Sequence, residues 1–182
     1  DPRKTGLWAL PFMLYDFQRD TVKWLESLIF VRQENGLIEK SRDLGMSWLI
    51  SALLYKHWQH PKDGAFQALV GSITASECDT IGDPSSLFEK LRIQSRLQPE
   101  ALLPKGWDGI MPYMKAVNPE NGSSITGENA SGDFGRSGRY KVILFDEFSA
   151  FEQDTQALTA SSQSSPCRIP CGRRSGQNQS GF

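Results

Sequence analysis

The segment from Lys40 to Ser47 has the residue types and the spacing of a phosphate-binding loop. It reads Lys40-Ser-Arg-Asp-Leu-Gly-Met-Ser47, and the standard phosphate-loop pattern is G-x-x-x-x-G-K-[ST]. In that pattern backbone N–H groups surround the phosphates, the lysine contacts the β and γ oxygens, and the hydroxyl binds Mg²⁺. Gly45 and Ser47 match the pattern, whereas Met46 stands where the lysine is expected. The segment therefore predicts a nucleotide-binding loop with an altered source of positive charge.

The positive charge could come from either basic residue at the start of this loop. Met46 cannot neutralise a phosphate, but the requirement is for a cation near the γ-phosphate rather than for one backbone position. Lys40 or Arg42 could supply that cation. At ~4 Å and an effective dielectric constant of ~20, such a pair interacts by roughly 4 kcal/mol before desolvation is subtracted. Taken alone, the segment is also compatible with a chance match.

Two adjacent carboxylates follow a continuous apolar run, as expected of a strand buried on both faces of a parallel sheet. Val142-Ile-Leu-Phe145 is β-prone throughout and leads directly into Asp146-Glu147. Asp146 could hold Mg²⁺ through water, and Glu147 could polarise the water that attacks the γ-phosphate. The alternative is a strand that ends in two solvated acids. Because 99 positions separate Asp146 from Ser47 (146 − 47), there is room for intervening strands and helices, and together the two motifs predict ATP hydrolysis.

The elements around these motifs alternate between helix and strand. Helical periodicity covers 12–30 and 48–57, a capping acid and a proline at 83–84 begin a third helix toward 95, and a fourth is expected over 153–160. Strands are expected at 37–38, 66–71, 142–145 and 167–170, with a β-hairpin between 113 and 127. This order predicts an α/β domain with a mainly parallel sheet, in which ligands gather at the carboxyl ends of the strands.

Composition limits the class of protein. The chain has 182 residues, 38% of them hydrophobic, which suits one domain over 1–171 followed by a Gly-, Ser- and Arg-rich tail over 172–182 that we expect to be flexible. No apolar run approaches the ~20 residues that cross a bilayer. The net charge of −1 gives no global signature of a nucleic-acid binder, so any contact with DNA would be local or made by other domains or subunits.

Taken in order, three segments resemble the large terminase subunit of tailed bacteriophages. They are Leu14-Tyr-Asp-Phe-Gln18, Lys40 to Trp48 and Val142 to Glu147. The resemblance implies a P-loop NTPase (ASCE-like) fold and explains the missing lysine, since some terminases carry it at the amino-terminal side of the loop. It also implies that Gln18, with Phe17, reads adenine; the alternative is an exposed helical glutamine beside a core phenylalanine. The residues then expected to contact ATP are Phe17, Gln18, Lys40, Ser41, Arg42, Asp43, Leu44, Gly45, Met46, Ser47 and Trp48.

The same resemblance assigns the remaining roles. Ser47 and Asp146 would hold Mg²⁺, and Glu147, Arg42 and Arg139 would be catalytic. Arg136 or Arg139 could stabilise the transition state within the subunit or across a ring interface, the alternative being a loop with solvated arginines. The implied partners are double-stranded viral DNA, the portal protein, the small terminase subunit and further copies in a ring. The implied location is the host cytoplasm, on the procapsid.

Two features depart from the family. A Ser/Thr-rich coupling motif is expected after the strand that follows Asp146-Glu147, but Cys171-Gly-Arg-Arg-Ser-Gly176 occupies its place. A full large terminase also carries a nuclease domain, and we expect none in this chain. Two alternatives stay open: a helicase-like P-loop ATPase, and an assembly module that binds nucleotide without hydrolysing it.

Overall fold

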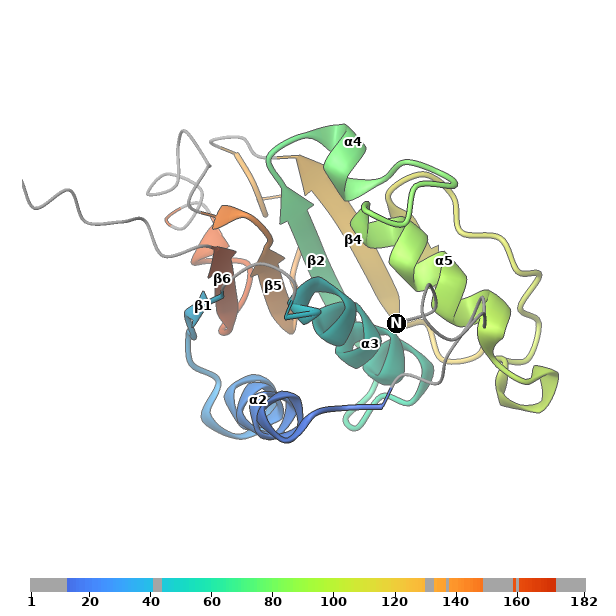
Figure 1. The fold of residues 1–182 in the computed structure, drawn as a ribbon, viewed down its shortest axis with the longest axis horizontal. Coiled ribbons are helices and arrows are strands. Elements are labelled where there is room, and N and C mark those ends of the chain that lie inside the picture. The colour runs from blue at the N-terminus through green and yellow to red at the C-terminus, as the bar shows by residue number, and fades with distance from the viewer. Residues whose placement is uncertain are drawn as a thin grey trace, which may run out of the picture.

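Six strands form one sheet, mostly parallel, that carries the candidate motifs. The computed structural model describes residues 13–40, 44–129, 133–136, 138–148, 159 and 161–172. Across the sheet the order is β1-β6-β5-β2-β4-β3. The strands are β1 (Ile38–Glu39), β2 (Gln67–Ser72), β3 (Lys115–Val117), β4 (Ser124–Asn129), β5 (Val142–Phe145) and β6 (Arg168–Gly172). Figure 1 shows the sheet behind the helices α3 and α5.

The pairing of the strands confirms the predicted fold class. β2 is parallel to β4 and β5, and β6 is parallel to β1 and β5. β3 is antiparallel to β4, which confirms the predicted hairpin. β6, which follows β5 in sequence, lies between β1 and β5, so the two motif-bearing strands are not neighbours. The expected helix over 153–160 and most of the expected tail over 172–182 lie outside the described residues.

Two of the helices, α2 and α5, pack against α3. The helical segments are α2 (Asp16–Glu26), a π-helical segment (Ser27–Arg32), α3 (Met46–Gln59), α4 (Ala75–Cys78), α5 (Leu87–Leu97) and a short 3-10 helix (Glu100–Leu102). The single helix expected over 12–30 is therefore an α-helix that continues into a π-helix. Within the described ranges, no helix is long and apolar enough to cross a membrane.

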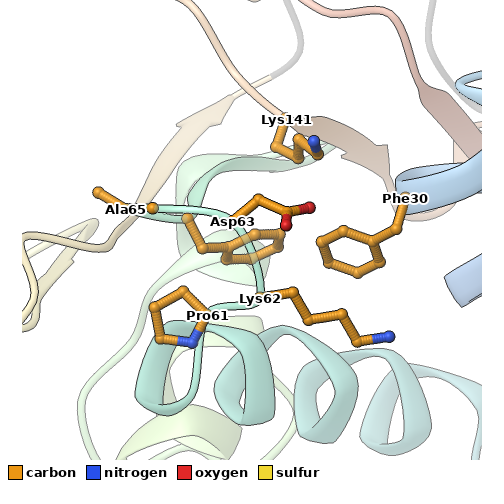
Figure 2. A pocket seen from close by; sticks show the side chains of 8 residues that line it. Phe30, Pro61, Lys62, Asp63, Ala65 and Lys141 are labelled. Atoms are coloured by element: carbon orange, nitrogen blue, oxygen red, sulfur yellow. The ribbon is translucent and has the colours of Figure 1, made fainter.

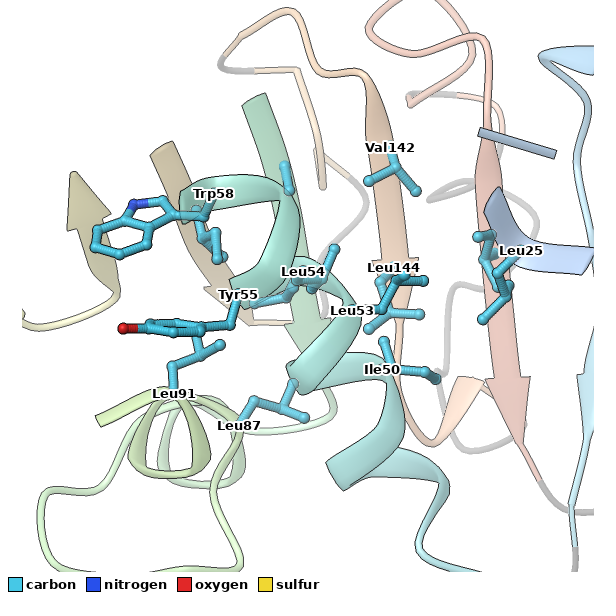
Figure 3. Close-up of a cluster of buried hydrophobic side chains, with 14 of the residues drawn as sticks. Leu25, Ile50, Leu53, Leu54, Tyr55, Trp58, Leu87, Leu91, Val142 and Leu144 are labelled. Atoms are coloured by element: carbon cyan, nitrogen blue, oxygen red, sulfur yellow. The ribbon is translucent and has the colours of Figure 1, made fainter. Parts of the chain in front are cut away.

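The core explains why the apolar run at 142–145 is continuous. Side chains of a strand alternate between the faces of a sheet, so a strand buried on both faces needs apolar residues at every position. Val142 and Leu144 join the main core, whereas Ile143 and Phe145 belong to a second cluster on the opposite face. Figure 3 shows residues of α3 filling the space between β5 and the α5 side chains Leu87 and Leu91.

A buried ion pair connects α5 to the segments that precede and follow it in sequence. Arg92 of α5 donates to both carboxylate oxygens of Asp79, at 2.6 and 2.9 Å. Asp79, which directly follows α4, also accepts from the backbone N–H of Met114 at 2.6 Å. The Asp79 side chain is fully buried, and only 9% of the Arg92 side chain is exposed. The pair therefore joins the segment after β2 to the segment before β3.

We expect Asp79→Asn to destabilise the protein by about 3 kcal/mol, because the buried guanidinium of Arg92 loses its shortest ion pair and keeps only the longer one, to Glu89 at 3.5 Å. Asp20→Asn is the matched control, since Asp20 pairs with Lys23 at 3.5 Å and both side chains are more than 75% exposed. Urea denaturation of both variants measures the difference. Equal stability of the two variants would show that the Arg92–Asp79 pair contributes little.

Candidate nucleotide-binding site

Three predicted site residues meet at the carboxyl edge of the sheet. Lys40 Nζ lies 3.0 Å from Asp146 Oδ1 and 3.2 Å from Ser47 Oγ. Ser47 Oγ donates to Asp146 Oδ2 at 3.0 Å, which closes the triangle. Lys40 follows β1 and Asp146 follows β5, so the topology brings together groups that lie 106 positions apart in sequence. The arrangement places one cation, one hydroxyl and one carboxylate within hydrogen-bonding distance of one another.

Backbone hydrogen bonds hold the two strand ends in place. The N–H of Lys40 donates to the carbonyl of Gly172 in β6 at 3.1 Å, and the N–H of Asp146 donates to the carbonyl of Gly71 in β2 at 2.8 Å. Each motif thus extends the ladder of a neighbouring strand by one step. The sheet therefore sets the distance between the lysine and the carboxylate.

The Lys40–Asp146 pair is well shielded from solvent. The side chains are 11% and 12% exposed. Burial by itself would lower the pKa of Lys40, but the negative charge of Asp146, with help from Glu147, raises that pKa above the ordinary value for lysine. Lys40 is therefore an ammonium group at neutral pH. Burial also raises the pKa of the nearby Cys171 thiol to about 12, which leaves that thiol neutral.

The amino end of α3 can receive an anion. Gly45 is the N-cap residue with φ of 68°, a left-handed conformation that favours glycine, and no side chain of the described residues caps the helix. The first N–H groups of a helix lack partners within the helix and carry partial positive charge. Because Ser47 is the second residue of α3, these donors lie beside the triangle. The site thus combines a lysine with the helix end that phosphate-binding proteins use.

Met46 does not take the place of the missing lysine. Its side chain is only 7% exposed and belongs to the main hydrophobic core. Lys40, by contrast, reaches the hydroxyl of Ser47 from the start of the loop. Within the described residues, the cation at the site is thus the lysine displaced toward the amino terminus.

Gln18 binds the loop backbone rather than solvent. Its side-chain Nε2 donates to the carbonyl of Leu44 at 3.0 Å, and its Oε1 accepts from the N–H of Tyr15 at 3.1 Å. Only 3% of Gln18 is exposed, so it is not the exposed helical glutamine of the alternative interpretation. Phe17 is 44% exposed and stacks on Tyr15, with ring centroids 5.9 Å apart. The adenine-reading role of Phe17 and Gln18 stays a prediction.

Glu147 has an unusual backbone. Its φ is 54°, in the left-handed region that non-glycine residues seldom adopt, and its N–H donates to Asp146 Oδ1 at 3.1 Å. Such conformations cost on the order of 1–3 kcal/mol and cluster at functional sites. The chain turns sharply just after β5, and Glu147 stays beside the carboxylate of Asp146.

The structure brings neither Arg139 nor the side chain of Trp48 into the Lys40–Ser47–Asp146 cluster. Ser41, Arg42 and Asp43 lie outside the described residues. Arg139 is exposed and precedes Lys141, whose N–H bonds to Gln67 at the first residue of β2. Asp146 bonds near the other end of β2, so Arg139 lies near the opposite end of β5 from this site. Trp48 follows Ser47 in α3 and is partly buried.

A small surface pocket also lies at the opposite edge. Figure 2 shows Phe30 between Lys62 and Lys141, whose ammonium groups lie 4.8 and 5.6 Å from the ring centroid. The pocket is lined by Phe30, Pro61, Lys62, Asp63, Gly64, Ala65, Phe66 and Lys141. Phe66 and Lys141 directly precede β2 and β5, so this pocket is separate from the Lys40–Asp146 cluster.

The donor set fits a magnesium–nucleotide complex better than a metal held by protein alone. In the part of the chain that the structure describes, no group of three or more His, Cys, Asp or Glu side chains could hold a metal. Mg²⁺ is usually bound by one or two protein oxygens together with substrate phosphates and waters. Ser47 Oγ and the Asp146 carboxylate, 3.0 Å apart, provide such a pair.

Comparison with known proteins supports the fold. The sequence matches no family model and no curated protein. Among solved structures, the HK97 bacteriophage large terminase is similar over 91% of this chain and 34% of its own, with 15% identity and a TM-score of 0.61. A mutant ATPase domain of the Thermus phage P74-26 large terminase is similar over 93% of this chain and 69% of its own, with 12% identity and a TM-score of 0.52. The chain spans about a third of the length of the HK97 protein. The chain therefore shares its fold with parts of these two bacteriophage large terminases.

Proposed function

We propose that this chain is the Mg²⁺-dependent ATPase motor domain of a viral DNA-packaging terminase. The observation that carries the proposal is the Lys40–Ser47–Asp146 triangle at the open amino end of α3. A buried ammonium group, the N–H groups of a helix amino end and a carboxylate–hydroxyl pair are the groups that a magnesium–triphosphate requires. The terminase fold adds the context of DNA packaging.

In this mechanism the residues of the chain exchange their present partners for those of the nucleotide. Lys40 would exchange Asp146 for the β and γ oxygens of the substrate, and Ser47 and Asp146 would hold Mg²⁺. Glu147 orients and polarises the attacking water, so the reaction is phosphoryl transfer to water. Arg42 is proposed to bind phosphate, and Arg139 to act from a neighbouring subunit. Phe17 and Gln18 are proposed to face the adenine.

The work that the ATPase does is proposed from the same likeness. In the full-length protein, hydrolysis would drive double-stranded DNA into a procapsid. The proposed partners are the portal protein, the small terminase subunit and further copies of the chain in a ring, within the host cytoplasm. Each of these partners is a proposal to be tested separately.

We expect the purified protein to hydrolyse ATP with Mg²⁺ and to lose hydrolysis when Mg²⁺ is chelated. Ser47→Ala should require more Mg²⁺ for half-maximal activity, by about tenfold, because it removes one metal ligand. The matched control is Ser76→Ala in α4, whose hydroxyl is exposed. Phosphate release as a function of Mg²⁺ concentration gives the comparison.

Three other outcomes would contradict parts of this proposal. Nucleotide binding without hydrolysis, even in a complete ring with DNA and portal protein, would indicate a non-hydrolysing assembly module. Separation of DNA strands coupled to hydrolysis would indicate a helicase-like ATPase. If the protein binds no nucleotide, the assignment of the phosphate-binding loop is wrong.

A further inference from the structure

Lys90 is a second buried lysine near the candidate nucleotide site. It is the fourth residue of α5, and only 5% of it is exposed. Long side chains in a helix point back toward its amino end. Accordingly, Lys90 Nζ donates to the backbone carbonyls of Ser85 and Ser86, the latter at 3.2 Å. Its ammonium group therefore lies at the positively polarised end of α5, where a cation is not favoured.

The ammonium group of Lys90 faces the start of α3. It lies 5.9 Å from the centre of the Trp48 ring, and Trp48 directly follows Ser47. α5 packs along α3 through side chains such as Leu87 and Leu91, which Figure 3 shows beside α3. This packing holds Lys90 near the amino end of α3, where the phosphate-binding loop ends.

Lys90 has no carboxylate within ion-pair distance among the residues that the structure describes. Burial lowers its pKa, and the charges of Asp146 and Asp83 only partly oppose that effect. The charge of Lys40 acts on Lys90 as well and disfavours a second ammonium group there. Buried charges are normally paired with an opposite charge, and the two carbonyls that accept from Lys90 carry only partial charges. An anion that enters between α3 and β5 would supply the missing partner.

We propose that Lys90 is a second cation for the terminal phosphate of the nucleotide and that it favours triphosphate over diphosphate. The inference rests on the proposed function, since it requires a nucleotide at Lys40 and Ser47. In the absence of nucleotide, the carbonyls of Ser85 and Ser86 and the ring of Trp48 hold the ammonium group. When a γ-phosphate is present, Lys90 turns toward it and the segment before α5 loses two hydrogen bonds. Triphosphate binding thus becomes coupled to the loop between α4 and α5.

The test compares the affinities of ADP and a non-hydrolysable ATP analogue, each with Mg²⁺, by titration calorimetry. Lys90→Met is expected to lower the affinity for the ATP analogue by about tenfold or more and to change the affinity for ADP by no more than about twofold. Lys90→Arg, which keeps the charge, should retain most of the preference for triphosphate. Lys23→Met is the control, since Lys23 is an exposed lysine of α2. Met is close to lysine in volume and removes a buried charge, so the variant should fold.

A second measurement uses the wild-type protein and does not depend on a variant that folds. In a protein with ¹³C-labelled lysine side chains, the NMR signal of Lys90, assigned by its loss in Lys90→Arg or Lys90→Met, should shift with the ATP analogue and not with ADP. The proposal would be overturned if Lys90→Met lowered the affinities for ADP and the ATP analogue equally, or if the chemical shift of Lys90 did not change with the analogue. Lys90 would then only order the loop before α5. If the wild type binds neither nucleotide, it is the proposed function that fails.

Discussion

Glu147→Gln is expected to abolish ATP hydrolysis while ATP binding stays close to that of the wild type. Glutamine keeps the size of the side chain but cannot accept a proton from the attacking water. Loss of a general base typically lowers the rate by about 10²- to 10⁴-fold. Glu147 lies beside the Asp146 carboxylate rather than in the Lys40–Ser47–Asp146 triangle, so the contacts that bind phosphate are retained. Single-turnover hydrolysis and calorimetric ATP binding on the same samples separate the two effects.

Glu34→Gln is the matched control for this substitution. Glu34 is an exposed acid that pairs with Arg32 at 3.6 Å and lies outside the site, so the Glu34→Gln variant should hydrolyse ATP at the wild-type rate. Glu147→Gly is a further arm, because glycine accepts the φ of 54° without strain. It should also be inactive, yet its free energy of unfolding should not fall. An active Glu147→Gln variant would show that another group positions the water.

The meeting of Lys40, Ser47 and Asp146 was predictable from sequence because it depends on a topological rule. Parallel strands that alternate with helices expose their carboxyl ends at one edge, so motifs that follow two such strands are brought close together. The continuous apolar run at 142–145 similarly indicated a strand buried on both faces. What these signals could not give was the strand order. The insertion of β6 between β1 and β5 depends on pairings between segments far apart in sequence.

Other features had no sequence signal. Lys90 is one lysine in an amphipathic helix, and only the packing of α5 against α3 shows that it is buried and faces Trp48. The hydrogen bond from Gln18 to the carbonyl of Leu44 depends on where α2 rests relative to the loop. Each of these depends on tertiary contacts rather than on local pattern.

Lys40→Met should lower the affinity for ATP by roughly 10- to 100-fold, because it removes a charge-assisted hydrogen bond to phosphate. The same change leaves the Asp146 carboxylate, 12% exposed, without its ion-pair partner. We therefore expect the variant to be less stable in the absence of Mg²⁺, and added Mg²⁺ to recover part of that stability. Titration calorimetry and thermal unfolding with and without Mg²⁺ measure the two effects.

A double variant tests whether the position of the lysine matters. Lys40→Met combined with Met46→Lys restores the lysine of the standard phosphate-loop pattern, so by sequence alone it should bind ATP well. In this structure residue 46 lies in the core at 7% exposure, and a lysine there would have to bury its charge or leave the core. We therefore expect the double variant to be less stable than Lys40→Met and to recover little affinity. Full recovery of the ATP affinity would mean that a lysine at either end of the loop can bind the phosphate. Lys40 would then not be required by this fold.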